Sequence, residues 1–164
     1  MFCKKVMVIG AGTMGSGIAQ VFLTHGCDVI LNDIKQEFID GGVKKIDKSL
    51  TKLVAKEKMT QADKDAAMGR LTGFVEITKD NMKDVDLVVE AAIEDMKIKG
   101  QIFKNLGEVC PPETILASNT SSLPITKIAA ATNRPDKVIG MHFFNPAPVM
   151  KLIELINGIA TSED

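Results

Sequence analysis

The residues best suited to acid–base chemistry lie near the carboxyl end of the chain. His142 ends one strand-like stretch, and Glu154 lies in a second one, beyond a proline-rich turn. A carboxylate bonded to an imidazole fixes the ring tautomer and stabilises the protonated form, as a general acid–base requires. The same-side strand neighbours of Glu154 are apolar, so its carboxylate needs a partner, because burying an unpaired charge is costly. The alternative is a strand-end histidine with Glu154 directed into solvent at a sheet edge.

A second polar group, the run A-S-N-T-S-S at residues 117–122, follows another predicted strand. Its hydroxyl and amide groups are suited to bonding a substrate oxygen or a cofactor amide. The alternative is an ordinary polar loop in which Ser121 or Ser122 caps the helix predicted after Pro124. Both interpretations can hold together, because one residue can cap the helix while another binds.

A glycine cluster near the start of the chain predicts a dinucleotide-binding turn. An apolar run at residues 6–9 meets G-x-G-x-x-G at Gly10, Gly12 and Gly15, and a helical pattern follows. The first glycine permits a tight bend, the second lets the backbone approach a pyrophosphate, and the third lets the helix pack close to the strand. Free N–H groups and the positive dipole end at the helix start then receive the phosphates.

An acidic residue extends this pattern. Asp33 ends a predicted strand at residues 28–33 and follows the turn by about 20 residues, the spacing of a carboxylate that accepts from an adenosine ribose hydroxyl. Its charge repels a 2′-phosphate and favours NAD over NADP, although Lys35 nearby would partly accommodate that phosphate. The alternative for Asp33 is a cap at the start of the next helix.

Alternating strands and helices are expected to position these residues. Strands are predicted at about 6–9, 28–33, 71–78, 85–90, 114–118, 137–142 and 149–156. This order predicts an α/β fold with a Rossmann-like, doubly wound, mostly parallel sheet. A long helical hairpin is expected at about 36–70, with a kink or break at Gly41–Gly42. The turn at 145–148 is too short for a parallel crossover, so the last two strands should form an antiparallel edge.

Composition indicates one globular domain, 1–164. The chain has 164 residues, is 45% hydrophobic and 25% charged, and carries a formal net charge of -1. These values give no electrostatic reason to expect nucleic-acid or membrane partners. The three cysteines have no C-x-x-C spacing, which predicts reduced thiols and a cytoplasmic location. The two histidines lack metal-type spacing with the cysteines, so we expect no metal site.

Four segments resemble the NAD-binding domain of the 3-hydroxyacyl-CoA dehydrogenase family, especially its clostridial-type 3-hydroxybutyryl-CoA members. They are residues 10–20, 88–94, 115–122 and 140–154. The resemblance implies an oxidoreductase of fatty acid and butyrate metabolism, with NAD as cofactor and an acyl-CoA substrate. It would transfer a hydride between NAD(H) and C3 of a (3S)-3-hydroxyacyl-CoA, such as 3-hydroxybutyryl-CoA.

The resemblance also implies roles for individual residues. His142 matches the histidine that takes the substrate proton, Glu154 the glutamate that orients it, and Ser121 a serine near the substrate oxygen. Residues that match cofactor-binding positions are Gly10, Gly12, Thr13, Met14, Gly15, Asp33, Glu94, Lys99, Asn119 and Asn145. Ser49 and Lys56 match a helix that contacts coenzyme A. From the residues alone, Glu94 would cap the following helix and Lys99 would be a solvated surface lysine.

The chain departs from the family in length. Family members continue into a helical domain that dimerises and closes over the acyl group, whereas this sequence stops at Asp164. We therefore expect an isolated domain with little activity of its own. Two other hypotheses remain: a nucleotide-binding module without chemistry, and an enzyme that acts on a hydroxy acid or sugar acid with the same cofactor fold.

Overall fold

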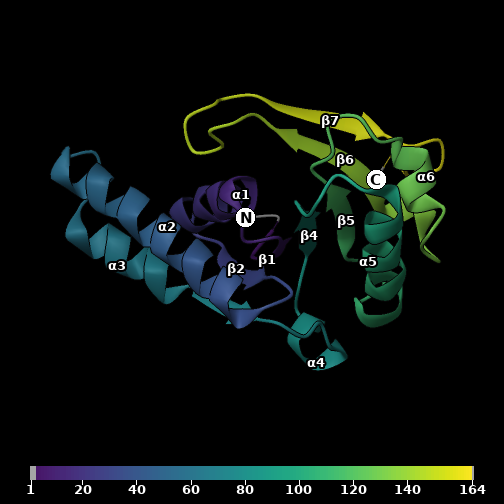
Figure 1. Ribbon diagram of the computed structural model, residues 1–164, viewed down its shortest axis with the longest axis horizontal. Coiled ribbons are helices and arrows are strands. Elements are labelled where there is room, and N and C mark those ends of the chain that lie inside the picture. The colour runs from purple at the N-terminus through teal and green to yellow at the C-terminus, as the bar shows by residue number, and fades with distance from the viewer. Residues whose placement is uncertain (1–2, 164) are drawn as a thin grey trace.

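A single seven-stranded sheet forms the centre of the molecule. The computed structural model describes residues 3–163, and its strands follow the order β3-β2-β1-β4-β5-β6-β7 (Figure 1). The strands are β1 (Lys5–Ile9), β2 (Asp28–Asn32), β3 (Leu71–Phe74), β4 (Leu87–Glu90), β5 (Ile115–Ser118), β6 (Val138–Phe143) and β7 (Ile153–Asn157). The first six are parallel, and β7 pairs antiparallel with β6. The predicted doubly wound sheet with an antiparallel edge is confirmed.

Helices cover both faces of this sheet. They are α1 (Thr13–Thr24), α2 (Gln36–Ala55), α3 (Gln61–Gly69), α4 (Lys79–Met82), α5 (Met96–Val109), α6 (Ile125–Ala129) and the 3-10 helix η1 (Pro135–Lys137). Val6 and Val8 of β1 pack in the core on the α1–α2 side, whereas Met7 and Ile9 pack in the core with α5 and α6. Because successive side chains enter different cores, the strands are continuous apolar runs. No helix within residues 3–163 is long and apolar enough to cross a membrane.

Local sequence signals set several helix ends. The Thr60 hydroxyl accepts from the backbone N–H of Asp63 at the start of α3. Gly26, with a φ of 87°, follows the end of α1. The expected cap at Glu94 is wrong: Asp95 caps α5, and its carboxylate accepts from the N–H of Ile98 over 2.9 Å.

The pair Gly41–Gly42 does not interrupt α2, which runs as one helix of 20 residues. At Gly42 a Cβ would lie 2.8 Å from Leu31 Cδ2 and 3.1 Å from the carbonyl oxygen of Ala11. The missing side chain lets α2 pack tightly against β2 and the glycine turn. Close packing, not a break, therefore explains this glycine.

The hairpin of β6 and β7 returns across the N-terminal helix. Its connecting loop extends over α1 (Figure 1), where a Cβ on Gly17 would lie 3.2 Å from Pro148 Cδ and 3.3 Å from Ala147 Cβ. Phe22 of α1 and Phe143 of β6 also meet edge-on, with ring centroids 6.3 Å apart. The loop occupies residues 149–152, which were expected to be strand, so β7 starts later. The hairpin is thus seated on the helix that begins at the glycine turn.

Candidate active site

The predicted site residues lie along the carboxyl edge of the parallel strands. Backbone hydrogen bonds join this edge across neighbouring strands, from Gly10 N–H to Asn32, from Ala91 N–H to Ile9, and from Asn119 N–H to Glu90. Their lengths are 2.8, 2.7 and 2.8 Å. The chain crosses from one side of β1 to the other at the β1–β4 junction, the position where such sheets bind ligands.

The glycine turn at this junction has the geometry that a pyrophosphate needs. Gly10 has a φ of +99°, and a Cβ there would lie 2.5 Å from the carbonyl oxygen of Ala91. A Cβ on Gly15 would lie 1.6 Å from the carbonyl oxygen of Gly10, so only glycine fits. No atom lies within 4 Å of a Cβ built on Gly12. The turn is therefore closed toward the protein and open toward a ligand.

The start of α1 is also free for an anion. Gly12 is the N-cap, no side chain caps the helix, and its first turn holds no acidic residue. Thr13 and Met14 are the first helical residues, and backbone N–H groups at such a position have no partner within the helix. This N-terminus fits the phosphates of a dinucleotide.

Asp33 connects the turn to the end of β2. Its Oδ2 accepts from the N–H of Ala11 and its Oδ1 from the N–H of Ile34, both over 2.7 Å. Each carboxylate oxygen has a further lone pair for a ribose hydroxyl. The alternative of a helix cap is wrong, because the N-cap of α2 is Lys35, with no side-chain cap bond. The ammonium group of Lys35 lies 3.6 Å from the carboxylate of Glu37.

His142 and Glu154 form a pair across the β6–β7 hairpin. Their backbones are in register, and His142 Nδ1 lies 3.0 Å from Glu154 Oε2. A carboxylate only accepts, so Nδ1 carries the proton and Nε2 remains as an acceptor. The side chains are 20% and 53% exposed, so Glu154 faces solvent at the edge and still binds the imidazole. The ring of Phe144 packs beside that of His142, with centroids 4.8 Å apart.

The loop after β5 lies next to this pair. Asn119 Oδ1 accepts from the N–H of Phe143 over 2.8 Å, which joins the loop to the residue after His142. Ser121 is exposed in this loop, and Asn145 is exposed in the hairpin turn. The expected capping hydroxyl of Ser121 or Ser122 is wrong, because the N-cap of α6 is Pro124, with no side-chain cap bond. Within the loop, Thr120 Oγ1 accepts from the N–H of Leu123 over 2.9 Å.

Lys99 is buried, which excludes the solvated surface position that its residue type favours. It is 1% exposed, and its Nζ lies 2.7 Å from Glu90 Oε1 and 3.9 Å from Glu94 Oε2. Sequence reasoning gave no role to Glu90, which is fully buried. The available signal was an acidic residue at the end of an otherwise apolar strand, since such a charge needs a buried partner.

The helical hairpin carries the two predicted coenzyme A residues. Ser49 is half-buried on α2, and Lys56 is exposed at its C-cap. Seven residues make about two helical turns, so both lie on one side of α2, about 10 Å apart along its axis. Lys45 and Lys52 are exposed at positions that continue this side. The arrangement is a basic stripe of the kind that attracts phosphates.

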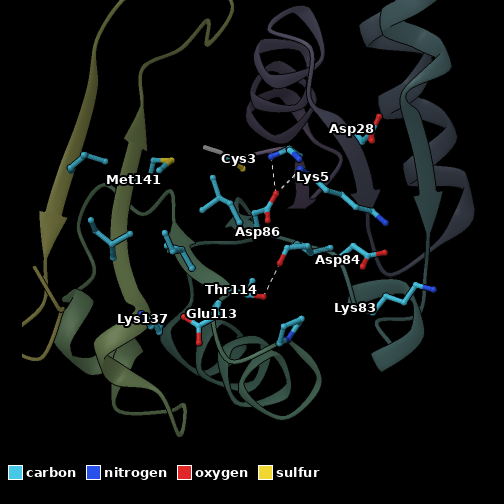
Figure 2. Close-up of a pocket in the computed structure, with 17 residues that line it drawn as sticks. Cys3, Lys5, Asp28, Lys83, Asp84, Asp86, Glu113, Thr114, Lys137 and Met141 are labelled. Carbon is cyan, nitrogen blue, oxygen red and sulfur yellow. Dashed lines mark hydrogen bonds between the residues drawn. The ribbon is translucent and has the colours of Figure 1, made fainter. Parts of the chain in front are cut away.

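A groove of about 1050 Å³ lies away from these residues (Figure 2). It follows the amino-terminal edge of β1, β4 and β5, where Asp86 accepts from the N–H groups of Lys4 and Lys5 over 2.7 and 2.9 Å. Both lysine and carboxylate side chains line it, as the close-up shows. Parallel sheets bind their ligands at the opposite, carboxyl edge, so this groove is not the candidate active site.

The cysteines do not add a nucleophile. Cys3, Cys27 and Cys110 are free thiols. Burial raises the pKa of Cys3 and of Cys110 to about 11, and it raises the pKa of Cys27 as well. A thiol with a raised pKa is protonated and unreactive near neutral pH. Within residues 3–163 no group of three or more His, Cys, Asp or Glu side chains is placed to hold a metal ion.

The strand order, the glycine turn and the histidine–carboxylate pair define a Rossmann-type dinucleotide-binding domain of the dehydrogenase class. The chain belongs to the family described as "3-hydroxyacyl-CoA dehydrogenase, NAD binding domain", whose model matches residues 5–164. This membership confirms the resemblance seen in the sequence and identifies NAD as the cofactor, which the open turn at Gly12 and the carboxylate of Asp33 fit.

Relatives of known class support the same assignment. The chain is 52% identical to a 3-hydroxybutyryl-CoA dehydrogenase of Clostridioides difficile, over 97% of this chain and 56% of that protein. Crystal structures of 3-hydroxybutyryl-CoA dehydrogenases from Escherichia coli and Ralstonia eutropha superpose with TM-scores of 0.95 and 0.93 at 44% and 46% identity. They cover 99% and 98% of this chain, and the chain covers 34% and 56% of theirs. The chain therefore spans about half the length, or less, of these relatives.

Proposed function

We propose that this chain is the cofactor-binding part of an NAD-dependent (3S)-3-hydroxyacyl-CoA dehydrogenase, with 3-hydroxybutyryl-CoA and acetoacetyl-CoA as the substrate pair. The observation that carries the proposal is the bond from His142 Nδ1 to Glu154, which leaves Nε2 as a proton acceptor at the carboxyl edge of the sheet. The names of the relatives support the substrate class.

In this proposal the residues of the chain bind, orient and move one proton. NAD held at the glycine turn and Asp33 would supply the hydride acceptor for C3 of the hydroxyacyl group. His142 Nε2 takes the hydroxyl proton as the C3–O bond becomes a carbonyl, and it returns the proton in the reverse direction. Glu154 holds the imidazole in the required tautomer and stabilises its charged form. Ser121 donates a hydrogen bond to the substrate oxygen.

The proposed cofactor contacts lie along the carboxyl edge of the sheet. Gly10, Gly12 and Gly15, with the N–H groups of Thr13 and Met14, hold the pyrophosphate. Asp33 binds the adenosine ribose. The nicotinamide half lies over the segments that bear Glu94, Lys99, Asn119 and Asn145. Asn119 and Asn145 support this placement. Asn119 is bonded to the residue after His142, and Asn145 lies in the adjoining turn.

Coenzyme A is proposed to bind along α2 at Ser49 and Lys56. Their shared side of the helix and the neighbouring lysines provide ammonium groups for its phosphates. Calorimetric titration with coenzyme A tests this placement. We expect Lys56→Ala to weaken binding about 3- to 10-fold. The exposed Lys104 of α5 is the control, and an equal loss in Lys104→Ala would show nonspecific attraction.

Activity of this chain alone is proposed to be weak. The relatives are about twice as long, and we propose that their additional length forms a helical domain that dimerises and closes the acyl pocket. An open pocket leaves the acyl group loosely held and wet, and positioning supplies much of such catalysis. We also propose a cytoplasmic location, in keeping with the three free thiols.

Two measurements test the whole proposal. Calorimetry should show binding of NADH and of acetoacetyl-CoA, and NADH absorbance should report slow reduction of acetoacetyl-CoA. Binding of NADH without any acyl-CoA interaction would instead favour a nucleotide-binding module without chemistry. Turnover equal to that of a full-length dehydrogenase would contradict the proposed weak activity.

A further inference from the structure

A closed ring of polar side chains joins the ends of β4 and β5 to the first turns of α5. Lys99 Nζ lies 2.7 and 2.9 Å from the two carboxylate oxygens of Glu90, and Ser118 Oγ donates to Glu90 Oε2 over 2.7 Å. The N–H of Thr120 donates to Ser118 Oγ over 3.3 Å, and its hydroxyl donates to the carboxylate of Glu94. Glu94 Oε2 lies 3.9 Å from Lys99 Nζ, which closes the ring.

The ring is anchored in the interior of the protein. Glu90 and Ser118 are 0% exposed, Lys99 1% and Thr120 4%. The Glu90 carboxylate also accepts from the N–H of Ala92 over 2.7 Å. Removing one member of a buried ion pair leaves the other charge uncompensated, which is strongly unfavourable. The pair therefore fixes its surroundings in one arrangement.

Two irregular segments of the candidate site depend on this ring. Residues 91–95 connect β4 to α5, and Ala92 is bonded directly to Glu90. Residues 119–123 connect β5 to α6, and Thr120 Oγ1 accepts from the N–H groups of Ser122 and Leu123 over 3.4 and 2.9 Å. Ser121 lies between these bonded residues, so the bonds of Thr120 fix the backbone on either side of it.

The position of the ring relates it to one half of the cofactor. Asp33 follows β2, so the adenosine half lies on the β2 side of the glycine turn. In the proposed function the other half would extend across the β1–β4 junction toward β5 and β6, where Ser121 and His142 lie. The ring joins the ends of β4 and β5 and so lies on this side of the junction. The bonds of Asp33 to Ala11 and Ile34 are outside it.

We propose that Glu90 and Thr120 are positioning residues for the nicotinamide half of the cofactor site. Glu90 fixes residues 91–95 and Ser118. Thr120 is bonded to Ser118 and to the N–H groups of Ser122 and Leu123, so it holds the loop of Ser121 in a fixed position relative to Glu90. Neither residue needs to touch the cofactor. This inference rests on the proposed NAD-dependent function.

The test compares a ligand that fills both halves of the site with one that lacks the nicotinamide. Affinities for NADH and for ADP-ribose are measured by calorimetry in Thr120→Val and in Thr120→Ser, which retains the hydroxyl. Thr72→Val is the matched control, because Thr72 is exposed on β3 away from the site. We expect Thr120→Val to bind NADH at least about 5-fold more weakly, with ADP-ribose affinity within about 2-fold. Thr120→Ser and Thr72→Val should bind both ligands normally.

Two results would overturn the inference. Unchanged NADH affinity in Thr120→Val would show that the ring does not act on the nicotinamide half, and an equal loss for both ligands would show general damage to the fold. If Thr120→Val does not fold, Ser118→Ala carries the same comparison, because it removes the bond from Ser118 Oγ to Glu90. Failure of the unsubstituted protein to bind NADH would contradict the proposed function itself, so the two failures are distinct.

Discussion

His142 on β6 and Glu154 on β7 lie directly opposite each other in antiparallel register, with Nδ1 and Oε2 3.0 Å apart. Twelve sequence positions separate them, and the hairpin that joins them is seated on α1 through Gly17. The same helix begins at the glycine turn. The acid–base pair and the dinucleotide turn are therefore held by one helix, which sets their relative placement.

Replacement of His142 by glutamine should separate chemistry from binding. The variant removes the proton acceptor, so single-turnover reduction of acetoacetyl-CoA should slow about 10²- to 10⁴-fold. The affinity for NADH should stay within about 2-fold, because the imidazole is not needed to hold the dinucleotide. Loss of NADH absorbance at high protein concentration measures the first quantity and calorimetry the second. Equal loss of both would assign His142 a structural role.

Glu154→Gln should affect orientation more than stability. The carboxylate is 53% exposed, so its loss should change the free energy of unfolding by less than about 1 kcal/mol. A neutral amide no longer stabilises the charged imidazole, so single turnover should slow about 10- to 100-fold. Urea unfolding and NADH absorbance provide the two measurements. The exposed Glu108 of α5 supplies the control Glu108→Gln, for which neither quantity should change.

Alanine substitution at two glycines of the same turn should have different effects, one on stability and the other on NADH affinity. In Gly15→Ala the new Cβ meets the carbonyl oxygen of Gly10 at 1.6 Å, so the protein should lose about 3 kcal/mol or more of stability. In Gly12→Ala the Cβ meets nothing within 4 Å, so stability should change by less than about 1 kcal/mol. That methyl group lies where the pyrophosphate approaches, and NADH affinity should fall about tenfold. Thermal unfolding and calorimetry distinguish the cases, and normal NADH binding by Gly12→Ala would place the pyrophosphate elsewhere.

Asp33→Asn should relax the choice between NAD and NADP. The amide lacks the negative charge that repels a 2′-phosphate, so the ratio of NADPH to NADH affinity should rise at least about tenfold. Glu37→Gln is the control, since Glu37 is an exposed carboxylate four residues away that pairs with Lys35. A similar change in both variants would mean that general charge, and not the position of Asp33, sets the preference.

The buried thiol of Cys110 should make stability depend on alkaline pH. Burial raises its pKa from 9.0 to about 11 in the folded protein. Between these values the unfolded thiol has lost its proton and the folded thiol retains it, so the contribution is complete below about pH 9 and is lost toward pH 11. As the pH rises from about 9 to about 11, the free energy of unfolding should therefore fall by about 1–3 kcal/mol more in the original protein than in Cys110→Ala. Urea unfolding at several pH values measures this difference, and parallel curves would contradict it.

Much of the cofactor half was predictable because its signals are local in sequence. The glycine turn needs specific backbone conformations and close approaches, which only glycine meets at Gly10 and Gly15. Asp33 comes at the end of a strand at a fixed distance from that turn. The alternation of apolar strands with amphipathic helices fixes a parallel sheet, because each helix must cover a face of that sheet.

Tertiary structure decided what depends on contacts between distant segments. Sequence spacing left the pairing of His142 with Glu154 undecided, and the register of β6 and β7 settled it. Lys99 has the residue type of a solvated side chain, but its burial beside Glu90 follows from the packing of α5 against β4. The bonds of Thr120 to Ser118 and Glu94 could likewise not be predicted among several neighbouring hydroxyl residues. These pairings depend on which side chains are excluded from water when distant segments pack together. A local sequence pattern does not predict that packing.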